Sequence, residues 1–268
     1  MIAIKAAVIG HPVKHSLSPM IHNHWLKKHG IDGSYEAIDI APEKLQATLS
    51  QLIDQGYAGF NVTIPHKIAV MDICDEIGAV AQAIGAVNTI RIDGGKVYGT
   101  NTDAFGFIEN LRDQQPGWNA AHGPALVLGA GGAAKAIVYA LREAGVKDIV
   151  VTNRTREKAE ELGETVVDWQ ERNNAVQNAG LIVNTTSLGM NGQDPLEIDL
   201  SGSRAIVYDI VYRPLMTPLL RQAEDLGLPV VTGLGMLLHQ ARPAFKGWFK
   251  ILPGVDNELQ DMVLKAAQ

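Results

Sequence analysis

The sequence predicts an α/β protein with two domains, and three observations indicate this fold class. Apolar segments of strand length alternate with amphipathic segments of helix length from residue 4 onward, which is typical of a mainly parallel sheet covered by helices. Turn-forming residues at 113–124 (DQQPGWNAAHGP) interrupt this alternation and indicate the passage into a second domain. After them, an apolar strand runs through a glycine-rich turn into a helix, a unit typical of doubly wound sheets.

The elements of the first domain follow from the apolar pattern and from the residues that end each segment. Strands are expected at 4–10, 33–40 and 57–64, and a β-hairpin with a Gly-Gly turn at 86–103. Helices are expected at 20–30, 41–56 and 65–77. The first of these helices ends at Gly30, and the third begins directly at Pro65.

Composition argues against several other classes of protein. The 268 residues suffice for one or two cores, and a formal net charge of −6 argues against a nucleic-acid partner, which needs a dense basic face. No apolar run is as long as a membrane span, so we expect no membrane partner. The single cysteine, Cys74, fits a reducing compartment, and we expect a cytoplasmic protein. The eight histidines form no HExxH pattern, and we expect no metal.

The glycine-rich turn predicts a binding site at the start of the second domain. Residues 125–128 are an apolar strand, and the GxGxxA pattern after it consists of Gly129, Ala130, Gly131, Gly132, Ala133 and Ala134. Glycines let the backbone turn tightly and approach a pyrophosphate, which then lies at the N-terminus of the following helix. With a strand before it and a helix after it, the pattern predicts a Rossmann-type dinucleotide site.

The end of the next strand indicates which dinucleotide binds. DIVVTNRT ends in Asn153 and Arg154, about where an NAD enzyme carries an acidic residue for the ribose 2′-hydroxyl. An arginine attracts a 2′-phosphate and can stack on adenine, while Thr155 and Lys158 can add a hydrogen bond and a second charge. The alternative is a surface arginine at the end of a strand. We expect NADP(H) rather than NAD(H).

Two more apolar strands of this domain, within 179–190 and 205–214, run into polar residues. In a doubly wound sheet such carboxyl ends line the cofactor crevice. Ile210 and Met236 are therefore candidates to back the nicotinamide. The alternative is that these are plain core strands that end in loops.

Nine short motifs are spread over nearly the whole chain. They are HSLSP at 15–19, NVTIPHK at 61–67, GAVNT at 85–89, NTDAFG at 101–106, GAGGAAKA at 129–136, NRT at 153–155, NTTSLGM at 184–190, YDIVYRPLMTPLL at 208–220 and GLGMLLHQA at 233–241. In this order they resemble the shikimate dehydrogenase family, whose members reduce 3-dehydroshikimate to shikimate with NADPH on the pathway to the aromatic amino acids.

The resemblance implies a domain organisation. An N-terminal α/β substrate domain at 1–102 would be followed by a Rossmann-like NADP-binding domain at 103–235, and helices at 236–268 would return to the substrate domain. Pro243 is expected to kink or split the first of these helices. The oligomeric state stays open between monomer and homodimer, because the family includes both.

Position by position, the resemblance also implies a set of site residues. For the substrate they are Ser16 and Ser18, which would hold its carboxylate, and Thr63, Lys67, Asn88, Asp103, Tyr212 and Gln240. For the cofactor they are Gly129 to Ala133, then Asn153, Arg154 and Thr155 at the adenosine phosphate, and Gly233. The chain departs from some members of the family, which carry an arginine at Lys158 and an acidic residue at Ala79, and Arg156 is an additional positive charge.

The chemistry of ketone reduction fits a lysine at position 67. The developing alkoxide needs an acid nearby, or at least a positive charge, and Lys67 can supply both. We expect Lys67 in the first turn of the helix at 65–77. Asp103 begins another expected helix, where an N-cap is its alternative role. The resemblance, and not their spacing, implies that Lys67 and Asp103 form an acid–base pair.

The two serines also have two interpretations. In an extended segment residues i and i+2 point the same way, so the hydroxyls of Ser16 and Ser18 can reach one carboxylate. The alternative is that Ser18 caps a helix that starts at Pro19.

Three other functions stay open. A quinate/shikimate dehydrogenase would tolerate NAD, against which Arg154 argues. A methylenetetrahydrofolate dehydrogenase also joins a catalytic-lysine domain to a Rossmann domain, but it has no reason to carry HSLSP. A non-catalytic NADP-binding regulator on the same scaffold has no reason to retain both Lys67 and Asp103.

Overall fold

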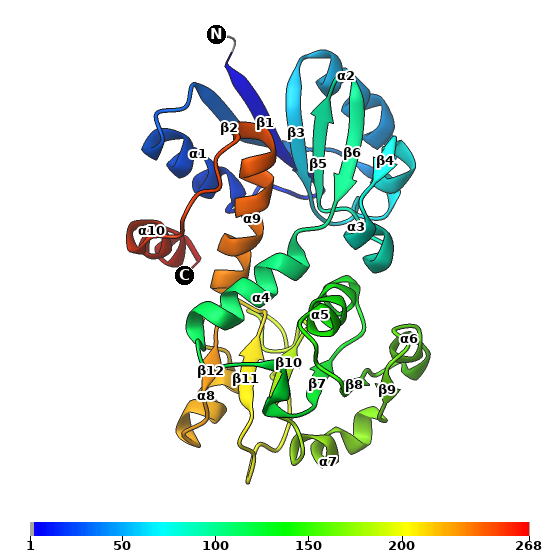
Figure 1. The fold of residues 1–268 in the computed structure, drawn as a ribbon, viewed down its shortest axis with the longest axis vertical. Helices are drawn as coiled ribbons and strands as arrows, with labels where there is room; N and C mark the ends of the chain where they lie inside the picture. Colours follow the sequence, from blue (N-terminus) through cyan, green and yellow to red (C-terminus); the bar gives the residue numbers. More distant parts are fainter. Residues whose placement is uncertain (1–2, 268) are drawn as a thin grey trace. The chain divides into compact units, whose positions relative to one another are not determined.

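The computed structural model describes residues 3–267, which divide into two compact units (Figure 1). The first unit contains the described residues up to Thr102 together with Gln240–Ala266 from the end of the chain. The second unit contains Asp103–His239. The turn-rich segment at 113–124, which the sequence suggested as the passage between domains, therefore lies inside the second unit.

The first unit is built on a six-stranded mixed sheet in the order β2-β1-β3-β5-β6-β4. Its strands are β1 (Ile4–Gly10), β2 (Gly33–Asp39), β3 (Tyr57–Val62), β4 (Glu76–Ile77), β5 (Thr89–Asp93) and β6 (Lys96–Thr100). β1 is parallel to β2 and β3, and β4 to β6, whereas β5 is antiparallel to β3 and β6. The expected hairpin is confirmed as β5–β6, and Gly94 and Gly95 turn it with φ of 57° and 79°, which glycine adopts without strain.

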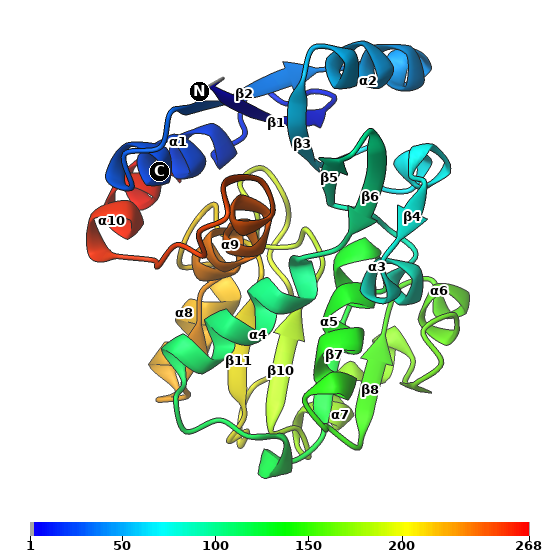
Figure 2. The same cartoon turned by 45° about the horizontal axis from the view of Figure 1, so that its top comes forward.

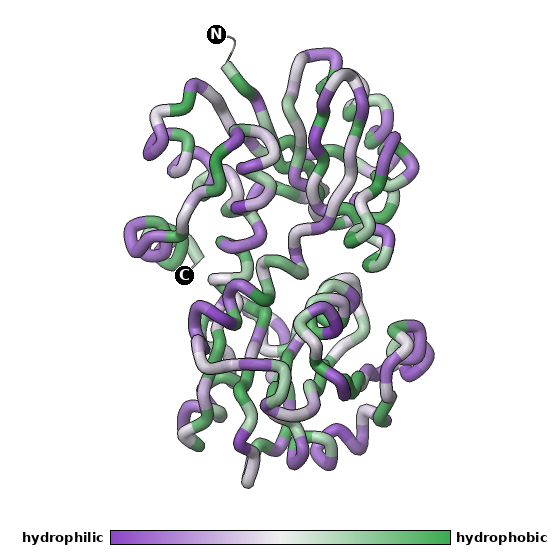
Figure 3. Tube along the Cα trace, in the orientation of Figure 1, coloured by the Kyte–Doolittle hydropathy of each residue, from purple (hydrophilic) through white to green (hydrophobic). Residues whose placement is uncertain are grey.

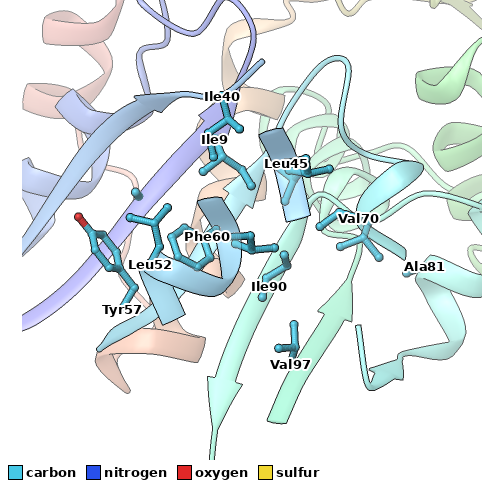
Figure 4. Packing of buried hydrophobic residues seen from close by; sticks show 14 residues of the cluster. Ile9, Ile40, Leu45, Leu52, Tyr57, Phe60, Val70, Ala81, Ile90 and Val97 are labelled. Carbon is cyan, nitrogen blue, oxygen red and sulfur yellow. The ribbon is translucent and has the colours of Figure 1, made fainter. Parts of the chain in front are cut away.

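One face of this sheet packs on helix α2 (Leu45–Asp54), which follows the short 3₁₀ helix η1 (Pro42–Lys44). Figure 4 shows Leu45, Phe60 and Ile90 within this cluster of buried side chains. Phe60 and Ile90 are fully buried, and burial of such a side chain contributes about 1.5–3 kcal/mol. The alternation of apolar and polar residues along β5 thus directs one set of its side chains to this core.

Helices α1 (Ser18–Lys28) and α9 (Leu234–Phe249) cover the opposite face, and α10 (Asn257–Ala267) follows α9 (Figure 2). Trp248 of α9 donates from Nε1 to the backbone oxygen of Ile90 at 2.9 Å. It lies so close to β3 that a Cβ on Gly59 would be 2.1 Å from Nε1, so only glycine fits there. Trp25 of α1 packs edge-on against Phe245 of α9, with ring centroids 5.5 Å apart.

The helix expected at 65–77 is wrong. Residues 64–68 form a turn, which is followed only by the 3₁₀ helix η2 (Ala69–Ile73) and by β4. The residues after η2 join the sheet, since the backbone amide of Asp75 donates to Val97 and that of Gly78 to Gly99, both at 2.9 Å. Sheet pairing therefore outweighs the weak local preference for helix. A further helix, α3 (Ala79–Ile84), ends at Gly85.

Two other local expectations are also corrected. The segment 16–18 is not extended, because Leu17 is in the αR region (φ −85°, ψ −6°) and Ser18 already begins α1. Of the two outcomes expected at Pro243, the split is wrong, because helix α9 runs through Pro243 to Phe249, and the kink stays a prediction. Burial of Phe245 and Trp248 one turn later holds the helix together despite the backbone hydrogen bond that proline removes.

The second unit is built on a six-stranded parallel sheet in the order β12-β11-β10-β7-β8-β9. The strands are β7 (Ala125–Leu128), β8 (Ile149–Thr152), β9 (Thr165–Val166), β10 (Leu181–Asn184), β11 (Ile206–Asp209) and β12 (Val230–Val231). The helices are α4 (Asp103–Gln114), η3 (Ala120–His122), α5 (Gly132–Glu143), α6 (Arg156–Glu160), η4 (Trp169–Glu171), α7 (Arg172–Val176) and α8 (Pro218–Asp225). The chain runs outward from β7 in both directions, so the topological switch point of this sheet lies beside β7.

Both faces of this sheet are covered, as its continuous apolar strands require. Val176 of α7 and Leu219 and Leu220 of α8 pack on one face, and on the other face Phe107 of α4 stacks on Tyr208 of β11 with centroids 4.8 Å apart. In Figure 3, α6 is largely hydrophilic, whereas α10 carries both hydrophilic and hydrophobic residues, as expected for a helix with one buried face. Among the residues described, no helix is both long and apolar enough to cross a membrane.

Candidate active site

Several chain segments meet at one edge of the first sheet. β1 and β3 are parallel and both end at this edge, while the antiparallel β5 begins there and β6 ends there. The backbone amide of Val62 donates to Asn88 at 2.8 Å, and that of Asn88 donates to Thr100 at 3.0 Å. The loops that carry the predicted substrate residues therefore emerge side by side.

Lys67 lies half-buried in the turn at 64–68, and its backbone is held from two sides. Its carbonyl oxygen accepts from the amide of Val87 at 2.8 Å. The preceding residue, His66, is buried, and its Nε2 is 2.7 Å from the carbonyl oxygen of Ile40, so Nε2 carries the proton. Thr63, also half-buried, donates its amide to Ile9 at 3.0 Å. Lys67 therefore lies in a turn whose backbone is fixed by hydrogen bonds, and not in a helix.

Asn88 is the centre of a buried hydrogen-bond network. It is only 3% exposed, and its Oδ1 accepts from the amide of Thr102 at 2.9 Å and from Thr89 Oγ1 at 2.9 Å. Its Nδ2 lies 3.4 Å from Gln240 Oε1, at the long end of the range for a hydrogen bond. Two predicted substrate residues 152 positions apart are therefore brought together.

The remaining predicted substrate residues are divided between the two units. Ser16 and Ser18 are half-buried, and Ser16 Oγ accepts from the Ser18 amide at 3.3 Å, so the start of α1 is stabilised locally. Asp103 and Tyr212 belong to the second unit. Asp103 is the first residue of α4 and lies in its first turn, where a carboxylate complements the helix dipole, and not in the preceding N-cap position.

In the second unit, the glycine-rich turn joins β7 to α5. Gly129 has φ of 111°, and a Cβ there would lie 2.4 Å from Thr185 Oγ1, so this position requires glycine. At Gly131 and Gly132 a Cβ would meet no atom within 4 Å, which leaves open space beside the N-terminus of α5. Free backbone amides and open space at a helix N-terminus fit the pyrophosphate of a dinucleotide.

A groove of about 500 Å³ lies at the carboxyl end of β8. It is lined by Asn153, Arg154, Arg156, Asp168, Trp169 and Gln170. Arg156 is bound by two carboxylates, with Glu160 at 2.8 Å and Asp168 at 2.5 Å, and these pairs raise its pKa. Arg154 thus shares the groove with an arginine whose charge is already compensated. The predicted residues Thr155 and Lys158 do not line it, although Thr155 accepts a hydrogen bond from Asn153 Nδ2 at 2.8 Å.

The carboxyl ends of β10 and β11 are joined by a buried carboxylate. Asp209 accepts from Asn184 Nδ2 at 3.0 Å, from the Val211 amide at 3.0 Å and from Thr217 Oγ1 at 2.7 Å. Burial nonetheless raises its pKa to about 6, with these three donors opposing the shift.

Asp209 fixes the start of the segment that carries Ile210 and Tyr212. Ile210 lies directly against Gly233, where a Cβ would be 2.3 Å from the Ile210 carbonyl oxygen. Met236, the second nicotinamide candidate, is 9% exposed. Two of the predicted cofactor residues, Ile210 and Gly233, are therefore neighbours.

Sequence reasoning missed the residues that hold the site together. His66, Asp209 and Asn61 were not singled out, although His66 and Asn61 lie within the NVTIPHK motif and Asp209 within YDIVYRPLMTPLL. A polar residue inside an otherwise apolar strand, as at Asn61, is the signal that could have found the last of these. In residues 3–267 no group of three or more histidine, cysteine, aspartate and glutamate side chains is placed to hold a metal ion.

The parallel sheet of the second unit, with a glycine turn after its central strand and an arginine at the end of the next strand, defines a protein of the Rossmann-type dinucleotide-binding class. Two family models match the chain. Residues 8–90 match the shikimate dehydrogenase substrate binding domain, and residues 113–189 match the shikimate/quinate 5-dehydrogenase family.

Curated and solved relatives agree with these matches. The NADP⁺-dependent shikimate dehydrogenase of Rhodospirillum rubrum is 50% identical over 97% of this chain and 96% of its own length. The structure of shikimate 5-dehydrogenase from Thermus thermophilus in complex with NADP(H) and shikimate has a TM-score of 0.87 at 40% identity, covering 99% of this chain and all of that one. Quinate dehydrogenase from Corynebacterium glutamicum in complex with NAD has a TM-score of 0.91 at 29% identity, covering 98% and 99%. The chain belongs to the shikimate dehydrogenase family.

Proposed function

We propose that this protein catalyses the reversible, NADPH-dependent reduction of 3-dehydroshikimate to shikimate, a step toward the aromatic amino acids. One observation carries the proposal. The segments of Thr63, Lys67, Asn88 and Gln240, which the family pattern assigns to the substrate, are joined by hydrogen bonds at one edge of the first sheet. The NADP⁺-dependent relatives, which the chain matches over nearly its whole length, support the same reaction.

In the proposed mechanism Lys67 is the general acid for the carbonyl oxygen of the substrate. The cofactor supplies the hydride for the ring carbonyl carbon. Negative charge then develops on the carbonyl oxygen, and the Lys67 ammonium stabilises it and donates the proton. The hydrogen bonds that fix the turn around Lys67 support this role because they limit the movement of the lysine backbone. Asp103 is proposed as its acid–base partner, as the family pattern implies.

The preference for NADP(H) is proposed to rest on the groove at the end of β8. Arg154 would contact the 2′-phosphate and stack on the adenine, with Asn153 and Thr155 beside it and Lys158 contributing charge at longer range. The open space at Gly131 and Gly132 supports binding of the pyrophosphate at the N-terminus of α5.

A quinate/shikimate dehydrogenase that accepts NAD is the second candidate. It is favoured by the similarity to the NAD-bound quinate dehydrogenase, with its TM-score of 0.91. The two candidates differ in cofactor and in one substrate hydroxyl, so they make different predictions for the same assays.

Four parallel spectrophotometric assays test both candidates, combining NADP⁺ or NAD⁺ with shikimate or quinate. We expect kcat/KM for shikimate to be at least about tenfold higher with NADP⁺ than with NAD⁺, since a 2′-phosphate contact contributes on the order of 1.5–3 kcal/mol. With NADP⁺ we expect kcat/KM to be higher for shikimate than for quinate. Comparable rates with NAD⁺ or quinate would assign the protein to the second candidate. Absence of turnover in all four assays would contradict both candidate functions and favour a non-catalytic regulator.

The cellular location and the assembly are part of the proposal as well. We propose a cytoplasmic protein, because the chain has one cysteine, Cys74, and a reducing compartment suits a free thiol. We propose a monomer or a homodimer. Light scattering coupled to size-exclusion chromatography distinguishes the two from the mass of 28.8 kDa per chain.

A further inference from the structure

A tyrosine that lies outside the nine short motifs is joined to the substrate edge of the first unit. Tyr35 lies on β2 and is 3% exposed. Its hydroxyl donates to Asn61 Oδ1 on β3 at 2.7 Å. Because the sheet order is β2-β1-β3, the Tyr35 side chain crosses β1 to make this hydrogen bond. A buried tyrosine hydroxyl needs a hydrogen-bond partner, and Tyr35 finds its partner on a strand that is not adjacent to its own, so it joins two strands that share no backbone hydrogen bonds.

From Asn61 the hydrogen bonds continue to Asn88. Asn61 Nδ2 donates to Thr89 Oγ1 at 3.1 Å, and Thr89 Oγ1 donates to Asn88 Oδ1 at 2.9 Å. Asn88 in turn contacts Thr102 and Gln240. Thr89 and Asn88 are 4% and 3% exposed, so each of these bonds is made in a water-poor environment, where loss of one partner is costly.

At its other end, Tyr35 is fixed to helix α1. Asn23 of α1 holds the Tyr35 backbone with two hydrogen bonds, one from Nδ2 to the Tyr35 carbonyl at 2.7 Å and one from the Tyr35 amide to Oδ1 at 3.1 Å. His22 of α1 stacks on the Tyr35 ring with centroids 4.1 Å apart and planes 8° from parallel. Burial lowers the pKa of His22 to about 3, so this stacking partner is neutral.

Ser18 is the first residue of the same helix. Burial raises the pKa of Tyr35 well above its ordinary value, and a hydrogen bond with the Ser18 side chain opposes this shift. Tyr35 thus stands between two groups of proposed substrate residues, Ser16 and Ser18 on one side and Asn88 and Gln240 on the other.

We propose that Tyr35 is a positioning residue for the substrate: its hydroxyl bonds to the Asn61–Thr89–Asn88 network, while Asn23 and His22 fix its backbone and ring to α1, the helix that Ser18 begins, so that the residues for the carboxylate and those for the ring keep one spacing. This inference rests on the proposed function, because it names shikimate as the molecule to be positioned. Tyr35 itself acts through Ser18 and Asn61.

Tyr35→Phe removes the hydroxyl and keeps the ring that stacks on His22. We expect KM for shikimate to rise about fivefold to tenfold, with KM for NADP⁺ within about twofold of the wild type, because the lost hydrogen bond lies in the substrate network alone. In a Ser18→Ala background the same change should raise KM much less, since the residue through which Tyr35 acts is already gone.

Tyr57→Phe is the matched control. Tyr57 lies on β3 of the same sheet, and its hydroxyl bonds to Glu36 at 2.5 Å, outside the network. It should leave both KM values unchanged. Thr89→Val interrupts the network from its other end and should reproduce the rise in KM, which keeps the proposal testable if Tyr35→Phe does not fold.

The outcomes separate the inference from the proposed function. A wild-type enzyme that turns over shikimate, with Tyr35→Phe and Thr89→Val both within about twofold of its KM, would overturn the inference alone. An equal rise in KM for Tyr57→Phe, or full additivity with Ser18→Ala, would reduce Tyr35 to an ordinary core residue. A wild-type protein without activity toward shikimate would remove the proposed function, and the inference with it.

Discussion

The candidate substrate site in the first unit and the candidate cofactor site in the second unit are built in opposite ways. In the second unit, the glycine turn and Arg154 lie within one continuous stretch, at the ends of the neighbouring strands β7 and β8. In the first unit, the polar edge combines segments around residues 63, 88, 102 and 240. A local site depends on a strand–turn–helix unit, whereas an assembled site exists only when the whole sheet has formed.

This difference has a physical basis. A phosphate is bound well by backbone amides at one helix N-terminus, so a single turn provides most of what is needed. A small ring with several hydroxyls needs side chains from several directions, and parallel and antiparallel strands deliver their ends to the same edge only through tertiary pairing. Changes in the assembled site should therefore affect substrate and turnover, and changes in the local site should affect the cofactor.

Lys67→Ala should produce the largest effect and tests the assembled site. Removal of the proposed acid should lower kcat about 10³-fold, within the range for a general acid, while the dissociation constant for NADP⁺ stays within about twofold. Stopped-flow and steady-state kinetics with shikimate measure the first quantity, and fluorescence titration measures the second. Lys96→Ala is the control, because Lys96 is an exposed lysine of the same sheet that pairs with Glu76 at 3.2 Å. Retention of more than a tenth of kcat in Lys67→Ala would contradict the assignment.

The same contrast explains what the sequence predicted and what it did not. The Rossmann unit and its glycine turn followed from local pattern, and the hairpin followed from Gly94-Gly95. The position of Lys67 in a turn did not, because residues 75–78 are drawn into the sheet by pairing with β6, which no local propensity contains. Asn88 and Gln240 could be named only from the family pattern, since their contact spans 152 positions.

The second unit also depends on a contact between distant segments, because the Asp209 carboxylate joins Asn184 to Thr217. Its pKa is raised by burial from an ordinary 3.8 to about 6, so the folded state binds a proton more tightly than the unfolded state. The stabilisation from this proton is complete below the unfolded pKa and is lost as pH rises through about 6. A shift of this size corresponds to up to about 3 kcal/mol.

Urea unfolding of the wild type and of Asp209→Asn at pH 4, 5.5 and 7 measures this dependence. The free energy of unfolding of the wild type, relative to the variant, should fall as pH rises, because the asparagine does not titrate. A constant difference across this range would show that Asp209 has an ordinary pKa.

Substitutions at two glycines of the cofactor site should distinguish an effect on folding from an effect on cofactor binding. Gly129→Ala should destabilise the second unit by about 2 kcal/mol or more, because the residue has positive φ and its new Cβ would meet Thr185. Gly131→Ala meets no atom and has φ of −84°, so its melting temperature should match the wild type while NADP⁺ binds more weakly. Differential scanning fluorimetry and cofactor titration on both variants check this. Equal melting temperatures for the two would mean that the turn adapts to a side chain at Gly129.

The smallest expected effect tests whether the cofactor groove depends on one arginine or two. Arg154→Ala should raise KM for NADP⁺ about tenfold and leave KM for NAD⁺ unchanged, because NAD⁺ lacks the 2′-phosphate that Arg154 would contact. Arg156→Ala should change KM for NADP⁺ less than about twofold, since its charge is already paired with Glu160 and Asp168. If Arg156→Ala raises KM for NADP⁺ as much as Arg154→Ala does, Glu160 and Asp168 must release Arg156 when the phosphate binds. The cofactor site would then need a rearrangement of its own, and it would differ from the substrate site only in the number of chain segments that form it.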